Sequence, residues 1–184
     1  MWQVSQSQQL AEDPGERSAH ARICWYLTES GFAVFFRGRF GRTVIMLIAM
    51  GASRADAEDA AQEAMLMAWR QWDSIQEPVA WTRTVAIRAY WRQARMERQA
   101  GPLEECDCQV ESDSDLAIFA EEQQRVLCML RALPPEQRTV IALHYDGATC
   151  EEIARLTGKP SSTVRSHLRH ARKTLKELMS SGDV

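Results

Sequence analysis

The chain has 184 residues, of which 45% are hydrophobic and 26% charged, with a formal net charge of −3 at pH 7. This length allows one ordinary domain or two small ones, and the composition excludes a largely disordered protein. The longest apolar run, Val44 to Met50, is too short to span a bilayer, and residues 1–20 are polar and contain no signal-peptide core. We therefore expect a cytoplasmic protein without membrane insertion.

The small net charge hides a strong segregation of charge along the chain. Residues 101–122 carry eight acids and no Lys or Arg, whereas residues 159–176 carry six bases and no acid. Residues 81–98 carry five arginines against one glutamate. An even spread of −3 would argue against a nucleic-acid partner, but two basic segments around an acidic one do not.

Apolar residues recur at intervals of three and four, so the sequence predicts an all-α protein. After an expected disordered tail at residues 1–20, one or two buried helices should end near Gly51. Their apolar residues are Phe32, Phe35, Phe36, Val44, Leu47 and Ile48. Ser53 is placed to cap the next helix. The expected apolar face of that helix is Ala57, Ala61, Ala64, Met65, Ala68 and Trp72.

A further helix is expected from Pro78 to about Arg98, and one of its sides is rich in arginine. Arg88, Arg92 and Arg95 are spaced at i, i+4 and i+7, and Trp91 lies beside them. Arginines can follow a phosphate backbone, and aromatic rings stack on unpaired bases at about 1–3 kcal/mol each. The pattern leaves an alternative open, in which the tryptophans belong to the core and the arginines pair with local acids.

Gly101 and Pro102 interrupt the helical pattern, and the acidic residues that follow include few large apolar side chains. Such a segment cannot bury enough surface to offset its chain entropy, so we expect a flexible linker at residues 101–115. The predicted organisation is two small helical domains, residues 21–100 and 116–184, joined by this linker.

The strongest local pattern is a helix-turn-helix at residues 149–176. Thr149 and Glu152 form a capping box, in which each side chain binds the backbone N–H of the other residue. Gly158 permits the left-handed turn that ends the first helix. Ser161 or Ser162 is expected to cap the second helix.

The second helix has one apolar stripe, formed by Val164, Leu168, Ala171 and Leu175. The predicted DNA-binding residues are Ser161, Ser162, Thr163, Arg165, Ser166, Arg169, Arg172 and Lys173. A short helix, a tight turn and a basic helix are the elements that place a recognition helix in the major groove. The alternative is an ordinary basic amphipathic helix with a solvated face.

The five cysteines are scattered and odd in number, which does not indicate a disulfide framework. Cys106 and Cys108 form a lone Cys-x-Cys, whereas a zinc site usually needs four ligands; a redox or metal sensor in the linker remains an alternative. Cys128 and Cys150 are expected to be small, partly buried residues. The sequence shows no catalytic nucleophile–base pair and no phosphate-binding loop, so we expect no enzyme activity, no cofactor and no metal.

Three strings, in this order and spacing, resemble the bacterial sigma factors of the extracytoplasmic-function (ECF) class in the sigma-70 family. The first is Ala55 to Glu63 with Ala68-Trp69-Arg70; the second is Pro78, Ala80-Trp81 and Arg83 to Ala86; the third is Leu133-Pro134, Gln137-Arg138, Glu152-Ile153-Ala154, Gly158, Thr163 to Leu168, Ala171-Arg172 and Leu175. The resemblance covers about residues 30–100 and 120–178.

The resemblance implies a factor that binds core RNA polymerase and directs promoter-specific transcription initiation. The residues implied to bind the clamp helices of the largest polymerase subunit are Asp56, Asp59, Gln62 and Glu63. Those implied to melt the minus-ten promoter element are Arg83, Arg88, Trp91, Arg92 and Arg95. The helix-turn-helix would read the minus-thirty-five element. The resemblance further implies a contact with the flap of the second polymerase subunit, and an anti-sigma factor is an additional expected partner. For the linker it implies a path through the polymerase cleft and RNA exit channel; a solvated spacer between the two domains remains an alternative.

One departure from the family concerns the melting helix. Where the family usually has an Asn and, four residues later, an Asp, this chain has Arg88 and Arg92. The added positive charge is expected to strengthen backbone contacts and relax base selectivity. A regulator that binds its operator through the helix-turn-helix, without polymerase, remains an alternative.

Overall fold

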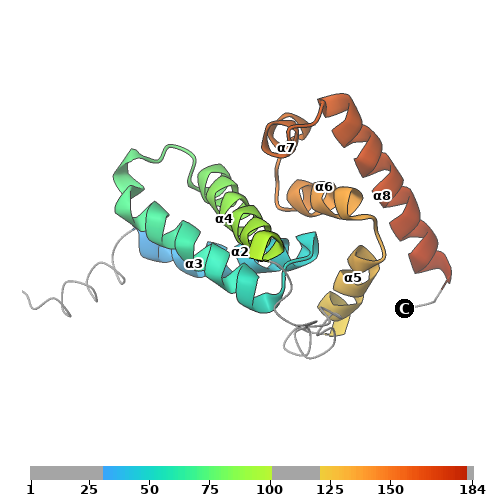
Figure 1. The fold of residues 1–184 in the computed structure, drawn as a ribbon, viewed down its shortest axis with the longest axis horizontal. Coiled ribbons are helices and arrows are strands. Elements are labelled where there is room, and N and C mark those ends of the chain that lie inside the picture. Colours follow the sequence, from blue (N-terminus) through green and yellow to red (C-terminus); the bar gives the residue numbers. More distant parts are fainter. Residues whose placement is uncertain (1–30, 101–120, 182–184) are drawn as a thin grey trace, which may run out of the picture. The chain divides into compact units, whose positions relative to one another are not determined.

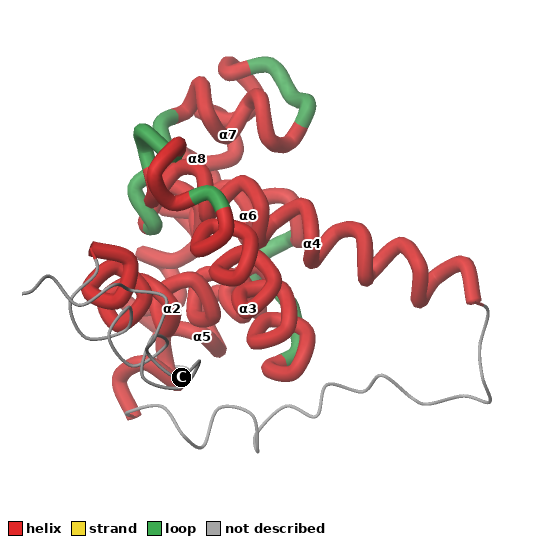
Figure 2. Tube along the Cα trace, turned by 90° about the vertical axis from the view of Figure 1, so that its left-hand side faces the viewer, coloured by secondary structure: helices red, strands yellow, loops and turns green. Residues whose placement is uncertain are grey.

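The computed structural model describes residues 31–100 and 121–181, and within them it contains helices, turns and loops but no strand (Figures 1 and 2). The α-helices are α2 (Gly31–Met50), α3 (Arg54–Arg70), α4 (Pro78–Ala100), α5 (Glu121–Arg131), α6 (Pro135–Tyr145), α7 (Cys150–Thr157) and α8 (Ser161–Ser181). The predicted all-α class is therefore confirmed. The predicted tail and acidic linker lie outside the described residues. Within those described, no helix is long and apolar enough to cross a membrane.

The chain divides into two units, Met1–Arg37 and Gly38–Val184, and the tertiary contacts discussed below lie within the second. The expected helix before Gly51 is a single one, α2. It buries Val44, Leu47 and Ile48, whereas Phe36, expected to be buried, is 36% exposed.

Gly51 ends α2 in a conformation that favours glycine. Its φ is +112°, and the N–H groups of Gly51 and Ala52 donate to the Ile48 and Leu47 carbonyl oxygens at 2.9 and 3.0 Å. This pair of bonds satisfies carbonyls that would otherwise be left at the helix end. Ser53 then caps α3 as predicted, because its hydroxyl oxygen accepts from the Asp56 N–H at 3.1 Å.

Alanines line the buried face of α3, which packs closely along α4. Ala57, Ala61, Ala64 and Ala68 are fully buried. Small side chains let two helix axes approach closely, and this gives the pair a well-defined geometry. Trp72 differs from its prediction: it lies half-buried in a short 3-10 helix, Trp72–Ser74, after α3 has ended.

Helices α5, α6 and α7 each pack on α8, and α6 also packs on α7. Their core includes the fully buried Ile141, Leu143, Ile153 and Val164. Pro135 begins α6, as its fixed φ favours. After α6, the chain turns at Gly147, whose φ is +95°.

Candidate polymerase and promoter interfaces

The helix-turn-helix begins with the predicted capping box. The Glu152 N–H donates to Thr149 Oγ1 at 3.2 Å, and the Thr149 N–H donates to Glu152 Oε2 at 2.7 Å. Chiefly because of this backbone N–H, and against the effect of burial, the pKa of the Glu152 carboxyl is lowered from its usual value. Gly158 closes α7 with a φ of +67°, as predicted. The cap and the glycine together fix where α7 starts and stops.

The prediction that Ser161 or Ser162 caps α8 is wrong, because the cap position is Pro160, one or two residues earlier. The helix begins at Ser161, and the Val164 N–H donates to the Pro160 carbonyl oxygen at 3.1 Å. Ser161 and Ser162 therefore lie in the first turn. Proline occupies the preceding position, where its missing N–H costs no helical hydrogen bond.

The apolar stripe of α8 lies in the core as predicted. Val164, Leu168 and Ala171 are buried, and Leu175 packs against the core cluster. The structure brings the predicted DNA-binding residues together along the rest of the helix. Ser162, Arg165, Arg169, Arg172 and Lys173 are exposed, whereas Ser161, Thr163 and Ser166 are half-buried.

Three cations of α8 have side-chain partners, two of them on neighbouring helices. Arg165 Nη2 lies 3.1 Å from Glu151 Oε1, and Lys173 Nζ lies 3.8 Å from Glu177 Oε1. Arg172 Nη2 lies 2.7 Å from His144 Nε2, a partner that sequence spacing does not reveal. Exposed ion pairs contribute only about 0–1 kcal/mol, so phosphate oxygens can replace these partners.

The predicted polymerase-binding residues lie on α3 in two different settings. Asp59 and Gln62 are exposed. Asp56 and Glu63 are half-buried; Asp56 Oδ2 accepts from Ser53 Oγ at 2.6 Å, and Glu63 accepts from Arg92.

Two large apolar residues extend the exposed side of α3. Leu66 and Trp69 are 45% and 49% exposed, and with Asp59 and Gln62 they are spaced by three, four and three residues. Residues so spaced share one helix face. Leu66 and Trp69 were not among the predicted polymerase-binding residues, although their spacing from Asp59 and Gln62 places them on the same face.

The predicted melting residues of α4 lie in different settings. Arg88 and Arg95 are exposed. Arg92 Nη2 donates to both carboxylate oxygens of Glu63, at 2.7 and 2.6 Å. Trp91 is half-buried and packs against the core cluster. The packing of Trp91 agrees with the core alternative, whereas the acid that pairs with Arg92 belongs to another helix, α3, and is not local in sequence.

Arg83 is the least accessible of the predicted melting residues. It is 3% exposed, and its Nε donates to Asp146 Oδ2 at 2.6 Å. The same carboxylate oxygen accepts from Arg39 of α2, which is 6% exposed. Arg83, Arg39 and Asp146 are called the Asp146 ion cluster below. Nothing in the sequence pattern pointed to Arg39 or Asp146 as partners of Arg83.

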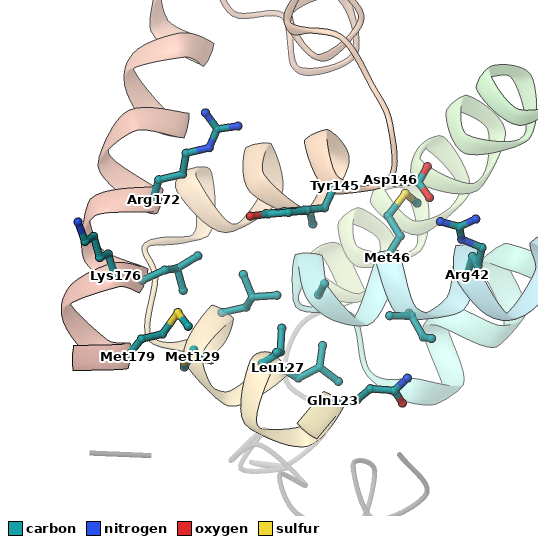
Figure 3. A pocket seen from close by; sticks show the side chains of 16 residues that line it. Arg42, Met46, Gln123, Leu127, Met129, Tyr145, Asp146, Arg172, Lys176 and Met179 are labelled. Atoms are coloured by element: carbon teal, nitrogen blue, oxygen red, sulfur yellow. The ribbon is translucent and has the colours of Figure 1, made fainter. Parts of the chain in front are cut away.

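An apolar groove of about 670 Å³ adjoins this cluster (Figure 3). Its apolar lining comprises Ile45, Met46, Ala49, Val126, Leu127, Met129, Leu130, Ala142, Leu175 and Met179. Three cations, Arg42, Arg172 and Lys176, also line it. The groove therefore combines an apolar floor with positive charge.

Among the described residues, no group of three or more His, Cys, Asp or Glu is placed to hold a metal ion. Cys128 is exposed, so its predicted partial burial is wrong: it lies on the outer side of α5, next to the buried Leu127. Cys150 is half-buried as predicted. Cys106 and Cys108 lie outside the described residues.

Comparison with known proteins matches both halves of the chain to one family. Residues 42–99 match the family description "Sigma-70 region 2", and residues 123–175 match "Sigma-70, region 4". The ECF RNA polymerase sigma factor SigK of Mycobacterium tuberculosis H37Rv is 31% identical over 163 residues, which cover 82% of this chain and 87% of SigK.

A further relative and a solved structure are also similar to this chain. A probable RNA polymerase sigma factor, RfaY of Xanthomonas campestris, is 28% identical over 149 residues, which cover 73% of this chain and 37% of RfaY. The solved structure of the sigma factor RpoE of Bartonella quintana, in complex with the anti-sigma factor NepR, has a similar fold, with a TM-score of 0.60, 21% identity and coverage of 81% of this chain and 96% of that one.

The chain belongs to the ECF sigma factors of bacterial RNA polymerase. It therefore acts in transcription initiation, with core RNA polymerase and promoter DNA as its partners.

Proposed function

We propose that α8 reads the minus-thirty-five element, α4 holds the melted minus-ten element, and α3 docks on the clamp helices of the polymerase. The observation that carries this is the placement of α8: one face is locked into the core by Val164, Leu168 and Ala171, and the basic residues line the others. A helix fixed in this way can enter a major groove without reorganisation. Melting by α4 needs no hydrolysis, because unstacking a base costs a few kcal/mol that binding can supply.

The exposed stripe of α3 supports its role in polymerase binding. Asp59 and Gln62 supply polar groups, and Leu66 and Trp69 supply apolar area on the same face. Interfaces commonly combine apolar anchors with a polar surround. Asp56 and Glu63 complete the proposed polymerase surface from half-buried positions.

We assign residues 21–100 to region 2, residues 101–115 to a linker and residues 116–184 to region 4, with a tail at residues 1–20. The linker would lie in the polymerase cleft, where its acids suit a basic channel. Because sigma factors are not enzymes and act with core polymerase, we further infer a cytoplasmic protein without catalytic activity. The flap of the second polymerase subunit is the proposed contact of the C-terminal module.

An anti-sigma factor is a second proposed partner, and the apolar groove is the feature that favours it. The related RpoE structure contains an anti-sigma factor. Exposed apolar grooves of this size commonly mark protein-binding sites. Val126 lines the groove and is 49% exposed, so Val126→Glu would place a charge on the proposed anti-sigma surface. This variant is expected to lose anti-sigma binding while transcription with core polymerase persists.

The decisive experiment is in vitro transcription with purified core polymerase and a library of promoters. Defined start sites that depend on the added chain are expected. Arg169→Ala should strongly reduce initiation at these sites, whereas Arg125→Ala, which removes an exposed arginine from α5, should not. Absence of specific initiation would contradict the proposal. Binding to an operator without polymerase would instead support a stand-alone regulator. A regulatory response that is lost in the Cys106→Ser, Cys108→Ser variant would support a sensor in the linker.

A further inference from the structure

His144, near the end of α6, contacts a cation of α8 that lies 28 residues further along the chain. Its Nε2 lies 2.7 Å from Arg172 Nη2, and Arg172 projects from α8 on the side of α6 (Figure 3). His144 is half-buried, whereas Arg172 is exposed. Only the packing of α6 on α8 brings the two side chains together.

The chemistry of the two side chains fixes the state of the imidazole ring. A guanidinium stays charged and can only donate, so His144 Nε2 is the acceptor. The ring is therefore neutral and carries its single N–H at Nδ1. This Nδ1 is buried and has no hydrogen-bond partner within the part of the chain that the structure describes. A protonated ring carries an N–H on both nitrogens and cannot accept from Arg172, so protonation breaks the contact.

A neutral partner holds Arg172 without cancelling its charge. Arg165, by contrast, faces the carboxylate of Glu151 at 3.1 Å, so a phosphate must compete with an acid for that cation. The contact with His144 engages one of the five N–H donors of the Arg172 guanidinium. The other donors and the full positive charge stay available to a phosphate oxygen.

Arg172 lies on the same side of α8 as other predicted DNA-binding residues. Arg165 and Arg169 precede it by seven and three residues, and residues at these spacings share a helix face. An arginine side chain has much rotamer freedom, and restraining it before binding lowers the entropy that is lost when it meets its ligand. His144 supplies such a restraint from α6.

Arg172 is also the charged group that faces the ring. From its own helix, the Tyr145 ring lies edge-on to His144, with the ring centroids 6.2 Å apart. The nearest acids of α6 and α7 have partners of their own. They are Asp146 in the Asp146 ion cluster, Glu151 with Arg165, and Glu152 with the Thr149 N–H. A change in the charge of the ring therefore acts directly on Arg172.

We propose that His144 is a positioning residue, which holds the Arg172 guanidinium ready for a backbone phosphate of the minus-thirty-five element. The proposal rests on the proposed function, which assigns Arg172 to promoter binding by α8. Imidazole changes its charge between about pH 5 and 8, so this restraint responds to pH. It is present while the ring is neutral and is lost when the ring is protonated.

The test uses polymerase holoenzyme reconstituted with each full-length variant, and a duplex fragment of the strongest promoter that library transcription selects. Electrophoretic mobility shift at fixed salt measures the affinity. At about pH 8, where imidazole is neutral, His144→Leu removes the acceptor and should weaken binding about fivefold, the effect typical of one hydrogen bond. His144→Gln, whose amide oxygen can replace Nε2 as acceptor, should bind as tightly as the wild type. In an Arg172→Ala background, His144→Leu should have no further effect.

The pH profile separates positioning from a merely structural role. Between about pH 8 and about pH 6, the wild type should lose about threefold in affinity relative to His144→Gln, whose side chain does not titrate. Because both proteins keep His167 and His170 of α8, the ratio of their affinities cancels the contribution of those two histidines. An unchanged ratio overturns the proposal. A ratio that rises on acidification also overturns it, because the protonated ring then binds phosphate itself.

Circular dichroism shows whether the variants fold. If His144→Leu does not fold, the comparison of the wild type with His144→Gln at the two pH values still decides the question. Equal binding by folded His144→Leu and the wild type overturns the proposal, as does a loss that persists in the Arg172→Ala background or that His144→Gln does not rescue. If the wild type initiates from defined sites and these variants bind no differently from it, only the positioning role fails. If the wild type supports no specific initiation, the proposed function fails, and the positioning role fails with it.

Discussion

Helices α4 and α8 are both basic and amphipathic, yet their cations are held very differently. On α8, Arg165, Arg169 and Lys173 are exposed, and the acids that contact Arg165 and Lys173 lie 14 and four residues away in sequence. On α4, Arg83 is buried against an acid 63 residues away, and Arg92 binds one 29 residues away. Spacing thus predicts which residues share a helix face, but acids from distant segments decide which cations are free.

The largest expected effect concerns Arg169, an exposed cation of α8. Arg169→Ala should weaken promoter binding by the polymerase complex about tenfold or more, because a bidentate arginine–guanine contact contributes about 1–3 kcal/mol. Binding curves on the selected promoter measure this, with Arg125→Ala as the control. If both variants bind equally well, α8 is not the recognition helix.

Substitution of Gly158, in the turn before α8, should destabilise the fold more than substitution of a glycine within a helix. Gly158→Ala places a side chain in the left-handed region, which costs roughly 1–2 kcal/mol. Gly41→Ala in α2 is the matched control, because neither added Cβ would meet another atom within 4 Å. It should be neutral or stabilising, since alanine favours a helix by about 1 kcal/mol over glycine. Urea unfolding of both variants checks the difference, and equal destabilisation would contradict it.

Arg88 of α4 is exposed, and the resemblance to the family leads us to expect an Asn at its position. We expect Arg88→Asn to shorten the lifetime of the open complex a few-fold, because one backbone contact is lost, and to sharpen selection among minus-ten sequences. Competition with heparin measures the lifetime, and promoter-library sequencing measures the selection. If both stay unchanged, the hypothesis about this departure is wrong.

The pair of Arg92 and Glu63 should contribute less. Both side chains are partly exposed, at 55% and 35%. A double-mutant cycle with Arg92→Gln and Glu63→Gln should give a coupling energy of about 0.2–1 kcal/mol in thermal unfolding. A larger value would mean that this pair contributes substantially to the stability of the fold.

The smallest effect is expected from the pH dependence of the α7 cap. The pKa of Glu152 is lowered in the folded chain, so its ionised form stabilises the fold above the unfolded pKa and loses this effect as pH falls through the folded pKa. Glu152→Gln should therefore lose less stability than the wild type between pH 7 and acidic pH. Identical acid unfolding curves would show that the cap has no such role.

The sequence by itself determined the helices, the caps of α3 and α7, the turn at Gly158 and the buried stripe of α8. These depend on residues within a few positions of one another, so the backbone and the helical period alone specify them. The first two family strings lie in α3 and α4, and the third extends over α6, α7 and α8. The relatives confirm what the strings implied about transcription initiation.

Only the tertiary structure decided which of those residues are accessible. Arg83 is buried beside its partner Asp146, and Leu66 and Trp69 stay exposed because no described helix covers them. The groove forms between residues of α2, α5, α6 and α8. The physical reason is that solvent exposure and ion pairing depend on distances between segments far apart in the chain. Spacing within a helix carries no information about those distances.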